Sequence, residues 1–92
     1  MIKSRGIIEN VSMTTAGTEY NYELPYGTKK FTIKLRELGY ELSVCFVSGE
    51  VDNYINLASG KAYTENDIKG QKNIIYFKST ADNLTAEILY WI

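Results

Sequence analysis

The chain has 92 residues, of which 45% are apolar and 23% are charged, and its net charge is −1. These values fit one ordinary globular domain spanning residues 1–92. They lack the basic excess of a nucleic-acid-binding protein, and no apolar run is long enough to cross a membrane. Neither nucleic acid nor a membrane is therefore an expected partner.

Apolar and polar residues alternate with a period of two along most of the chain, which is the pattern of half-buried β-strands. No stretch of ten residues has a convincing helical period. Strands are predicted at EYNYEL, KFTIKLR, ELSVCFV, NIIYFKS and LTAEILYWI, with weaker ones near residues 6–10, 54–57 and 61–64. Strands at this spacing indicate an all-β sandwich or barrel.

Turn residues separate these strands. Leu24-Pro25-Tyr26-Gly27 suits a type I turn, with proline second and glycine fourth. Ser59-Gly60 suits a tight hairpin between the strands on either side of it. TENDIKG, residues 64–70, is the one place where a helical turn is expected.

The two runs KFTIKLR and ELSVCFV predict a hairpin closed by the loop 37–40. In that register every apolar residue lies opposite another apolar residue, and a slip by one residue would destroy all the pairs. The predicted pairs are Arg36–Glu41, Leu35–Leu42, Ile33–Val44 and Phe31–Phe46.

Lys30, Lys34 and Arg36 form a basic stripe on the outward side of the same strand. A charged outer face is usual for an amphipathic sheet, and lysines there discourage edge-to-edge aggregation. A binding role for the stripe is the alternative, and both interpretations stay open at this point.

Residue chemistry gives no catalytic centre. The chain has no histidine, so neither a Ser–His nor a Cys–His nucleophile can form. Cys45 alternates with core positions and is expected to be a small apolar side chain that is buried or half-buried. The acidic groups at residues 50–52 and 65–67 suit turns better than a calcium loop. No enzymatic activity, cofactor or metal is expected.

Aromatic side chains make up 13% of the residues, eight of them tyrosines. Tyrosine is enriched in protein interfaces because it combines apolar area with a polar tip. Tyr26 and Tyr40 are expected in loops. Exposed tyrosines could also stack on sugar rings, so Tyr26, Tyr40 and Tyr54 are the candidate residues of a carbohydrate-binding module.

The order of segments resembles a set of small proteins encoded among the virion genes of tailed bacteriophages and prophages. The similarity covers about Leu24 to Trp91 and consists of strands, turns and a few aromatic residues. The segments that carry it are LPYGTKKFTIKLR, LSVCFVSGE, YINLASGKAYTENDI, NIIYFKST and AEILYWI. The matching positions are expected to define the fold: Phe31, Phe46, Tyr54, Gly60, Tyr63, Tyr76, Phe77 and Trp91.

This resemblance implies an all-β fold, a small antiparallel β-sandwich or jelly roll of about seven or eight short strands. It implies a non-enzymatic virion protein, assembled in the bacterial cytoplasm, that forms homo-oligomers or binds a capsid or head–tail protein. The loop between Arg36 and Glu41 is unusually apolar at its tip. Leu38 and Tyr40, with Tyr26 and Tyr54, are therefore the predicted interface residues. The alternatives are a carbohydrate-binding module and a phage-encoded inhibitor of a host protein.

Overall fold

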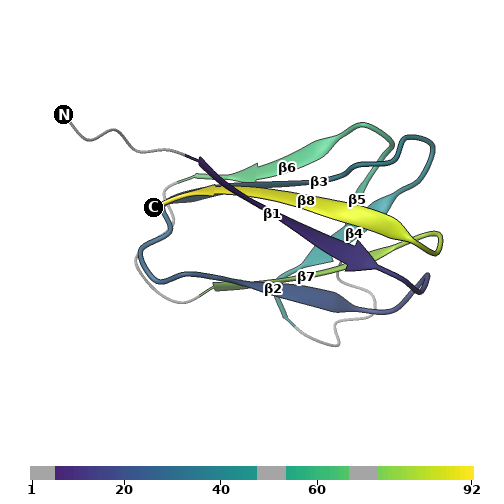
Figure 1. The fold of residues 1–92 in the computed structure, drawn as a ribbon, viewed down its shortest axis with the longest axis horizontal. Coiled ribbons are helices and arrows are strands. Elements are labelled where there is room, and N and C mark those ends of the chain that lie inside the picture. The colour runs from purple at the N-terminus through teal and green to yellow at the C-terminus, as the bar shows by residue number, and fades with distance from the viewer. Residues whose placement is uncertain (1–5, 48–53, 67–72) are drawn as a thin grey trace.

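The computed structural model describes residues 6–47, 54–66 and 73–92, and these form eight β-strands (Figure 1). The strands are β1 (Gly6–Met13), β2 (Tyr20–Leu24), β3 (Lys30–Leu35), β4 (Leu42–Cys45), β5 (Ile55–Leu57), β6 (Ala62–Glu65), β7 (Asn73–Ser79) and β8 (Leu84–Trp91). All the strands predicted from the alternation are present. The described residues include no helix of the length and hydropathy that a membrane crossing requires.

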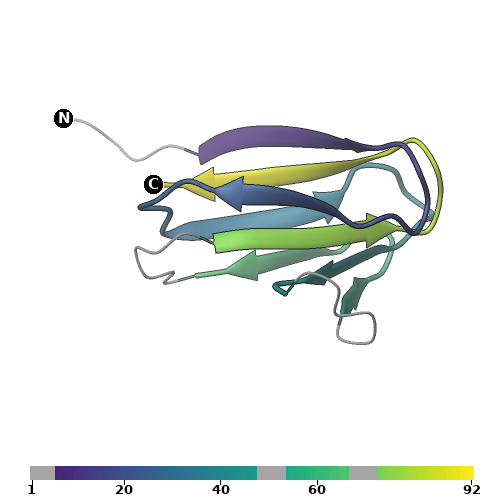
Figure 2. The same cartoon turned by 90° about the horizontal axis from the view of Figure 1, so that it is seen from below.

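The strands form two antiparallel sheets that pack face to face (Figures 1 and 2). One sheet has the order β1-β8-β3-β6 and the other the order β2-β7-β4-β5. The chain passes from one sheet to the other at every connection except the one between β4 and β5. This order is that of a jelly roll, and the prediction of a small antiparallel β-sandwich is confirmed.

The core lies between the two sheets, because the inward side chains of both layers meet there. In β8, residues at alternate positions from Leu84 to Tyr90 are buried, while the outward ones are partly exposed. The buried apolar side chains are Met13, Leu24, Phe31, Ile33, Leu35, Leu42, Val44, Cys45, Leu57, Ile75, Phe77, Leu84, Ala86, Ile88 and Tyr90. A single thin core of this kind is what a domain of about this size can build.

The predicted hairpin between residues 30–36 and 41–47 is wrong. β3 hydrogen-bonds to β8 and β6, whereas β4 hydrogen-bonds to β7 and β5, so the two strands belong to different sheets. Phe31 and Phe46 do meet, with ring centroids 6.2 Å apart and an edge-on geometry, but Phe31 is buried on β3 whereas Phe46 follows β4 and is 43% exposed. The alternation identified the inward residues of both strands except Phe46, because facing strands in opposite layers bury Ile33 and Val44 just as a hairpin would.

Two turn predictions also need correction. The turn after Ala58 exists, since Lys61 N donates to Ala58 O at 3.0 Å, but it carries the chain from one sheet to the other and closes no hairpin. The proline turn is shifted by one residue, because Thr28 N donates to Pro25 O at 3.1 Å. Gly27 then occupies the third position with φ of 94°, a conformation that favours glycine.

The predicted helical turn at residues 64–70 is not found where the structure describes the chain. Thr64 and Glu65 are the last residues of β6. The rest of that prediction, from residue 67 on, lies outside the described residues.

Replacing Phe77 by alanine tests the position of the core. Phe77 is fully buried on β7, so Phe77→Ala should lower the free energy of unfolding by about 3–5 kcal/mol, a large part of the usual total for a domain. Tyr26→Ala is the matched control, since Tyr26 is 79% exposed and should change stability by about 0.5 kcal/mol or less. Urea unfolding followed by tryptophan fluorescence measures both, and equal effects would contradict the described core.

Candidate interaction surfaces

Four connections meet at one end of the sandwich, on the right in Figure 1: residues 14–19, 36–41, 58–61 and 80–83, together called the loop end. Hydrogen bonds join each connection to another. Glu41 N donates to Thr80 Oγ1 at 3.1 Å and Gly39 N donates to Ser59 Oγ at 2.6 Å. Ala16 N donates to Asp82 Oδ1 at 2.7 Å. The loop end is therefore one connected surface although its parts lie far apart in the sequence.

Leu38 and Tyr40 lie at the loop end and are 74% and 42% exposed. The backbone between them is held, because Gly39 adopts φ of 92° and its N–H is bound by Ser59. Leu38 also lies against Gly60, since its Cδ2 atom is 3.5 Å from the position that a Cβ atom would occupy on that glycine. An apolar side chain thus faces solvent from a loop that is fixed by its neighbours.

Tyr26 and Tyr54, the other two predicted interface residues, are not part of the loop end, although Tyr54 contacts it through Glu19. Tyr26 is exposed in the turn between β2 and β3, at the opposite end of β3 from Leu38. Tyr54 lies just before β5 and is only partly exposed. The structure therefore places Leu38 and Tyr40 in one loop and leaves Tyr26 apart from them, while Tyr54 is bonded to a different connection of the loop end.

Tyr54 has its hydroxyl and one ring face already engaged. Its hydroxyl donates to Glu19 Oε1 at 2.7 Å, and Lys78 Nζ lies 4.4 Å from its ring centroid. Burial is the main cause that raises the pKa of Tyr54, and the hydrogen bond to Glu19 adds to it. A cation over the ring leaves less aromatic surface for a sugar to stack on.

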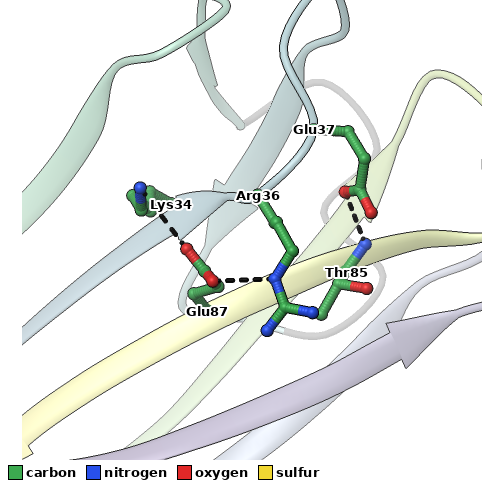
Figure 3. Close-up of polar contacts among 5 residues, drawn as sticks. All are labelled: Lys34, Arg36, Glu37, Thr85 and Glu87. Atoms are coloured by element: carbon green, nitrogen blue, oxygen red, sulfur yellow. Dashed lines mark hydrogen bonds and ion pairs between the residues drawn. The ribbon is translucent and has the colours of Figure 1, made fainter.

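The basic stripe on β3 contacts the outward side chains of β8. Lys34 Nζ and Arg36 Nε lie 3.4 and 2.8 Å from the two carboxylate oxygens of Glu87 (Figure 3). Lys30 Nζ lies 4.7 Å from the ring centroid of Trp91. The cations of the stripe thus have partners within their own sheet, and the predicted Arg36–Glu41 pair is replaced by Arg36–Glu87.

Glu87 accepts from both cations, and the hydrogen bond from Arg36 is the main cause that lowers its pKa. Its contacts with Lys34 act in the same direction, while partial burial opposes them. Next to this group, Thr85 N donates to Glu37 Oε1 at 2.9 Å, so the start of β8 is also tied to the loop end (Figure 3).

A shallow hollow of about 290 Å³ lies on the outer face of the same sheet. It is lined by Ile8, Thr32, Lys34, Glu87, Ile88 and Leu89. Sequence reasoning missed it, because it needs β1, β8 and β3 side by side. The available signal was Leu89, an apolar residue at an outward position of the last strand.

The described residues show no cluster of three or more His, Cys, Asp or Glu side chains that could hold a metal. Cys45 is buried as expected, and its Sγ donates to Val47 O at 3.3 Å. The acidic residues 50–52, and Asp67 of the second acidic group, lie outside the described part of the chain.

Comparisons with known proteins support the fold alone. No protein-family model matches the chain, and no curated protein does. A designed double-stranded β-helix solved by NMR aligns with a TM-score of 0.54 and 18% identity, over 96% of this chain and 99% of that one. A chain from a structure of disulfide-linked pili, the Bacillus endospore appendages, aligns with a TM-score of 0.51 and 16% identity, over 96% of this chain and 84% of that one.

Replacing Glu87 by glutamine tests the contacts in Figure 3. Because all three side chains are partly solvated, Glu87→Gln should lower the free energy of unfolding near neutral pH by about 0.5–1 kcal/mol. Because the pKa of Glu87 is lower in the folded protein than the ordinary carboxyl pKa of 4.5, its ionised form stabilises the fold at any pH above about 4.5. This stabilisation is lost as the pH falls through the folded-state pKa.

The difference between wild type and Glu87→Gln should therefore shrink below about pH 4.5 and at high salt. Unfolding curves measured across the acid range give this difference directly. Glu41→Gln is the matched control at an exposed glutamate, for which little change is expected. A difference that does not depend on pH would contradict the role of the Glu87 carboxylate.

Proposed function

We propose that this chain is a non-enzymatic structural subunit of a tailed bacteriophage or prophage virion, assembled in the bacterial cytoplasm. It acts by binding copies of itself, or a capsid or head–tail protein, through the loop end. The observation that supports this most directly is the exposed Leu38 on a loop that its neighbours hold in place.

A fixed apolar loop is suited to binding because little conformational entropy remains to be lost. Burying one leucine side chain contributes about 1.5–3 kcal/mol, and Tyr40 adds aromatic area beside it. A net charge near zero gives little repulsion between copies. Contacts of this size are weak singly but add up when many copies are held close together.

The use of a similar fold in a polymer is consistent with this proposal. A chain from the disulfide-linked pili of Bacillus endospore appendages has a similar fold at 16% identity. Carbohydrate binding is less favoured, because Lys78 covers one face of Tyr54 and Tyr26 lies alone at the other end.

Substitutions at the loop end test the proposed contact. Leu38→Ser and Tyr40→Ala should each raise the dissociation constant of self-association about tenfold or more, since each removes buried apolar area. Sedimentation velocity over a range of concentrations measures this constant. Val47→Ser is the matched control, because it removes an apolar side chain that is 58% exposed and lies away from the loop end.

If the loop-end variants associate as wild type does, this surface is not the self-contact. The proposal would also be contradicted if Val47→Ser weakened association as much as the loop-end variants do. The effect would then depend on exposed apolar area anywhere on the surface.

Co-sedimentation with particles tests the virion assignment. Phage particles induced from the source bacterium should band on a density gradient together with this protein, at a constant ratio to the major capsid protein. Mass spectrometry of each fraction measures that ratio. Particles that form without the protein would contradict the structural role and favour the host-inhibitor alternative.

A further inference from the structure

β1 is the longest strand at an open edge of either sheet. It has eight residues and, among the described strands, hydrogen-bonds only to β8, whereas the other edge strands β2, β5 and β6 have five, three and four. Figures 1 and 2 both show β1 at the margin of its layer. No described residue hydrogen-bonds through its backbone to the outer side of β1.

The register identifies the backbone groups that face outward. Thr85 O accepts from Arg36 N at 2.9 Å, and Trp91 O accepts from Lys29 N at 2.7 Å. Because alternate residues of an antiparallel strand bond to opposite neighbours, the odd-numbered residues of β8 bond toward β3 and the even-numbered ones toward β1.

The partners of these even-numbered β8 residues are the odd-numbered residues of β1. The backbone groups on the outer side of β1 therefore belong to the residues between them. These are Gly6, Ile8, Asn10 and Ser12, of which the last three are exposed.

β1 lacks most features that protect an open edge from pairing. Its sequence GIIENVSM contains no lysine, arginine or proline, and its pairing with β8 runs without a bulge. β3, which is covered on both sides, carries the lysines of its sheet instead. The one charge on β1 is Glu9, which lies opposite Ile88 and is exposed.

We propose that β1 pairs antiparallel with β1 of a second copy of this chain, so that two four-stranded sheets join across a two-fold axis. The residues whose backbone groups face the outer side of β1 must then lie opposite the same kind of residue in the second copy. The two longest such registers pair residues 6–12 or residues 7–13 of the two copies. The first places Glu9 opposite Glu9 of the second copy, and like charges at directly opposite positions are unfavourable.

The register over residues 7–13 avoids this repulsion. Asn10 lies opposite Asn10 of the second copy, Ile8 opposite Ser12, and Glu9 opposite Val11. Each outward-facing pair exchanges two hydrogen bonds, so the ladder contains about six. Ile8, which is 68% exposed and borders the hollow, becomes partly covered by the second copy.

This inference deepens the proposed function, since it names a second copy as partner, but it concerns a different surface from the loop end. Disulfide cross-linking reads the edge contact alone. Asn10→Cys in a Cys45→Ser background should form a covalent dimer on mild oxidation, because facing Cα atoms in a hydrogen-bonded pair lie about 5.5 Å apart, within the reach of a disulfide.

Ser12→Cys in the same background is the matched control. In the proposed register the two introduced thiols are displaced by four positions along the strand, or about 13 Å, and should not cross-link. A monomeric Asn10→Cys protein, or equal cross-linking at both positions, would overturn the pairing. A Leu38→Ser change should leave cross-linking at position 10 in place, so failure of the loop-end contact is distinguishable from failure of this one.

Proline provides the second test, because the N–H of Asn10 faces outward and that of Val11 bonds to β8. In a Leu38→Ser background, which weakens the loop-end contact, Asn10→Pro should keep a cooperative unfolding transition and lose edge dimers, measured by lysine cross-linking with mass spectrometry. Val11→Pro should instead destabilise the fold. Dimers that persist in folded Asn10→Pro would overturn the proposal. If Asn10→Pro does not fold, Ile8→Lys places a charge on the edge and should abolish dimers in the same assay.

Discussion

The position of β8 between β1 and β3 is the constraint on which the rest of the structure depends. Its inward residues fill one wall of the core, and its outward residues Glu87 and Trp91 hold the cations of β3. Thr85, at its start, is bound by Glu37 of the loop end. The last strand of the chain therefore organises the core, the outer face of its sheet and part of the loop end together.

The strands and their inward faces could be predicted from the sequence because a period of two is a local property. The strand partners could not. Ile33 and Val44 satisfy the alternation equally well as hairpin neighbours and as buried side chains of two different sheets. Similarly, Arg36 has an acidic residue within reach in either arrangement, Glu41 nearby in the chain or Glu87, which is 51 residues away. Charge and hydropathy alone do not distinguish these two arrangements.

The candidate surfaces, too, could be predicted only where they depend on residues that are close in the sequence. Leu38 and Tyr26 are exposed because they occupy tight turns, and turn residues are recognisable from a few neighbours. Tyr54 looked equally available, but Glu19 and Lys78, which engage it, come from distant parts of the sequence. The hollow and the open edge of β1 depend on both ends of the chain lying side by side, so no local pattern predicts them.

Two different contact surfaces would allow an assembly larger than a dimer, which the β1 edge alone would not. A two-fold pairing of β1 strands uses the same patch on both copies, so by itself it closes at a dimer. The loop end contains the four connections at one end of the sandwich, whereas β1 runs along its side. A dimer joined through β1 would therefore present two loop ends, and each could bind a further copy or another protein. Growth beyond a pair requires such a second, distinct surface, and the loop end supplies it in the proposed assembly.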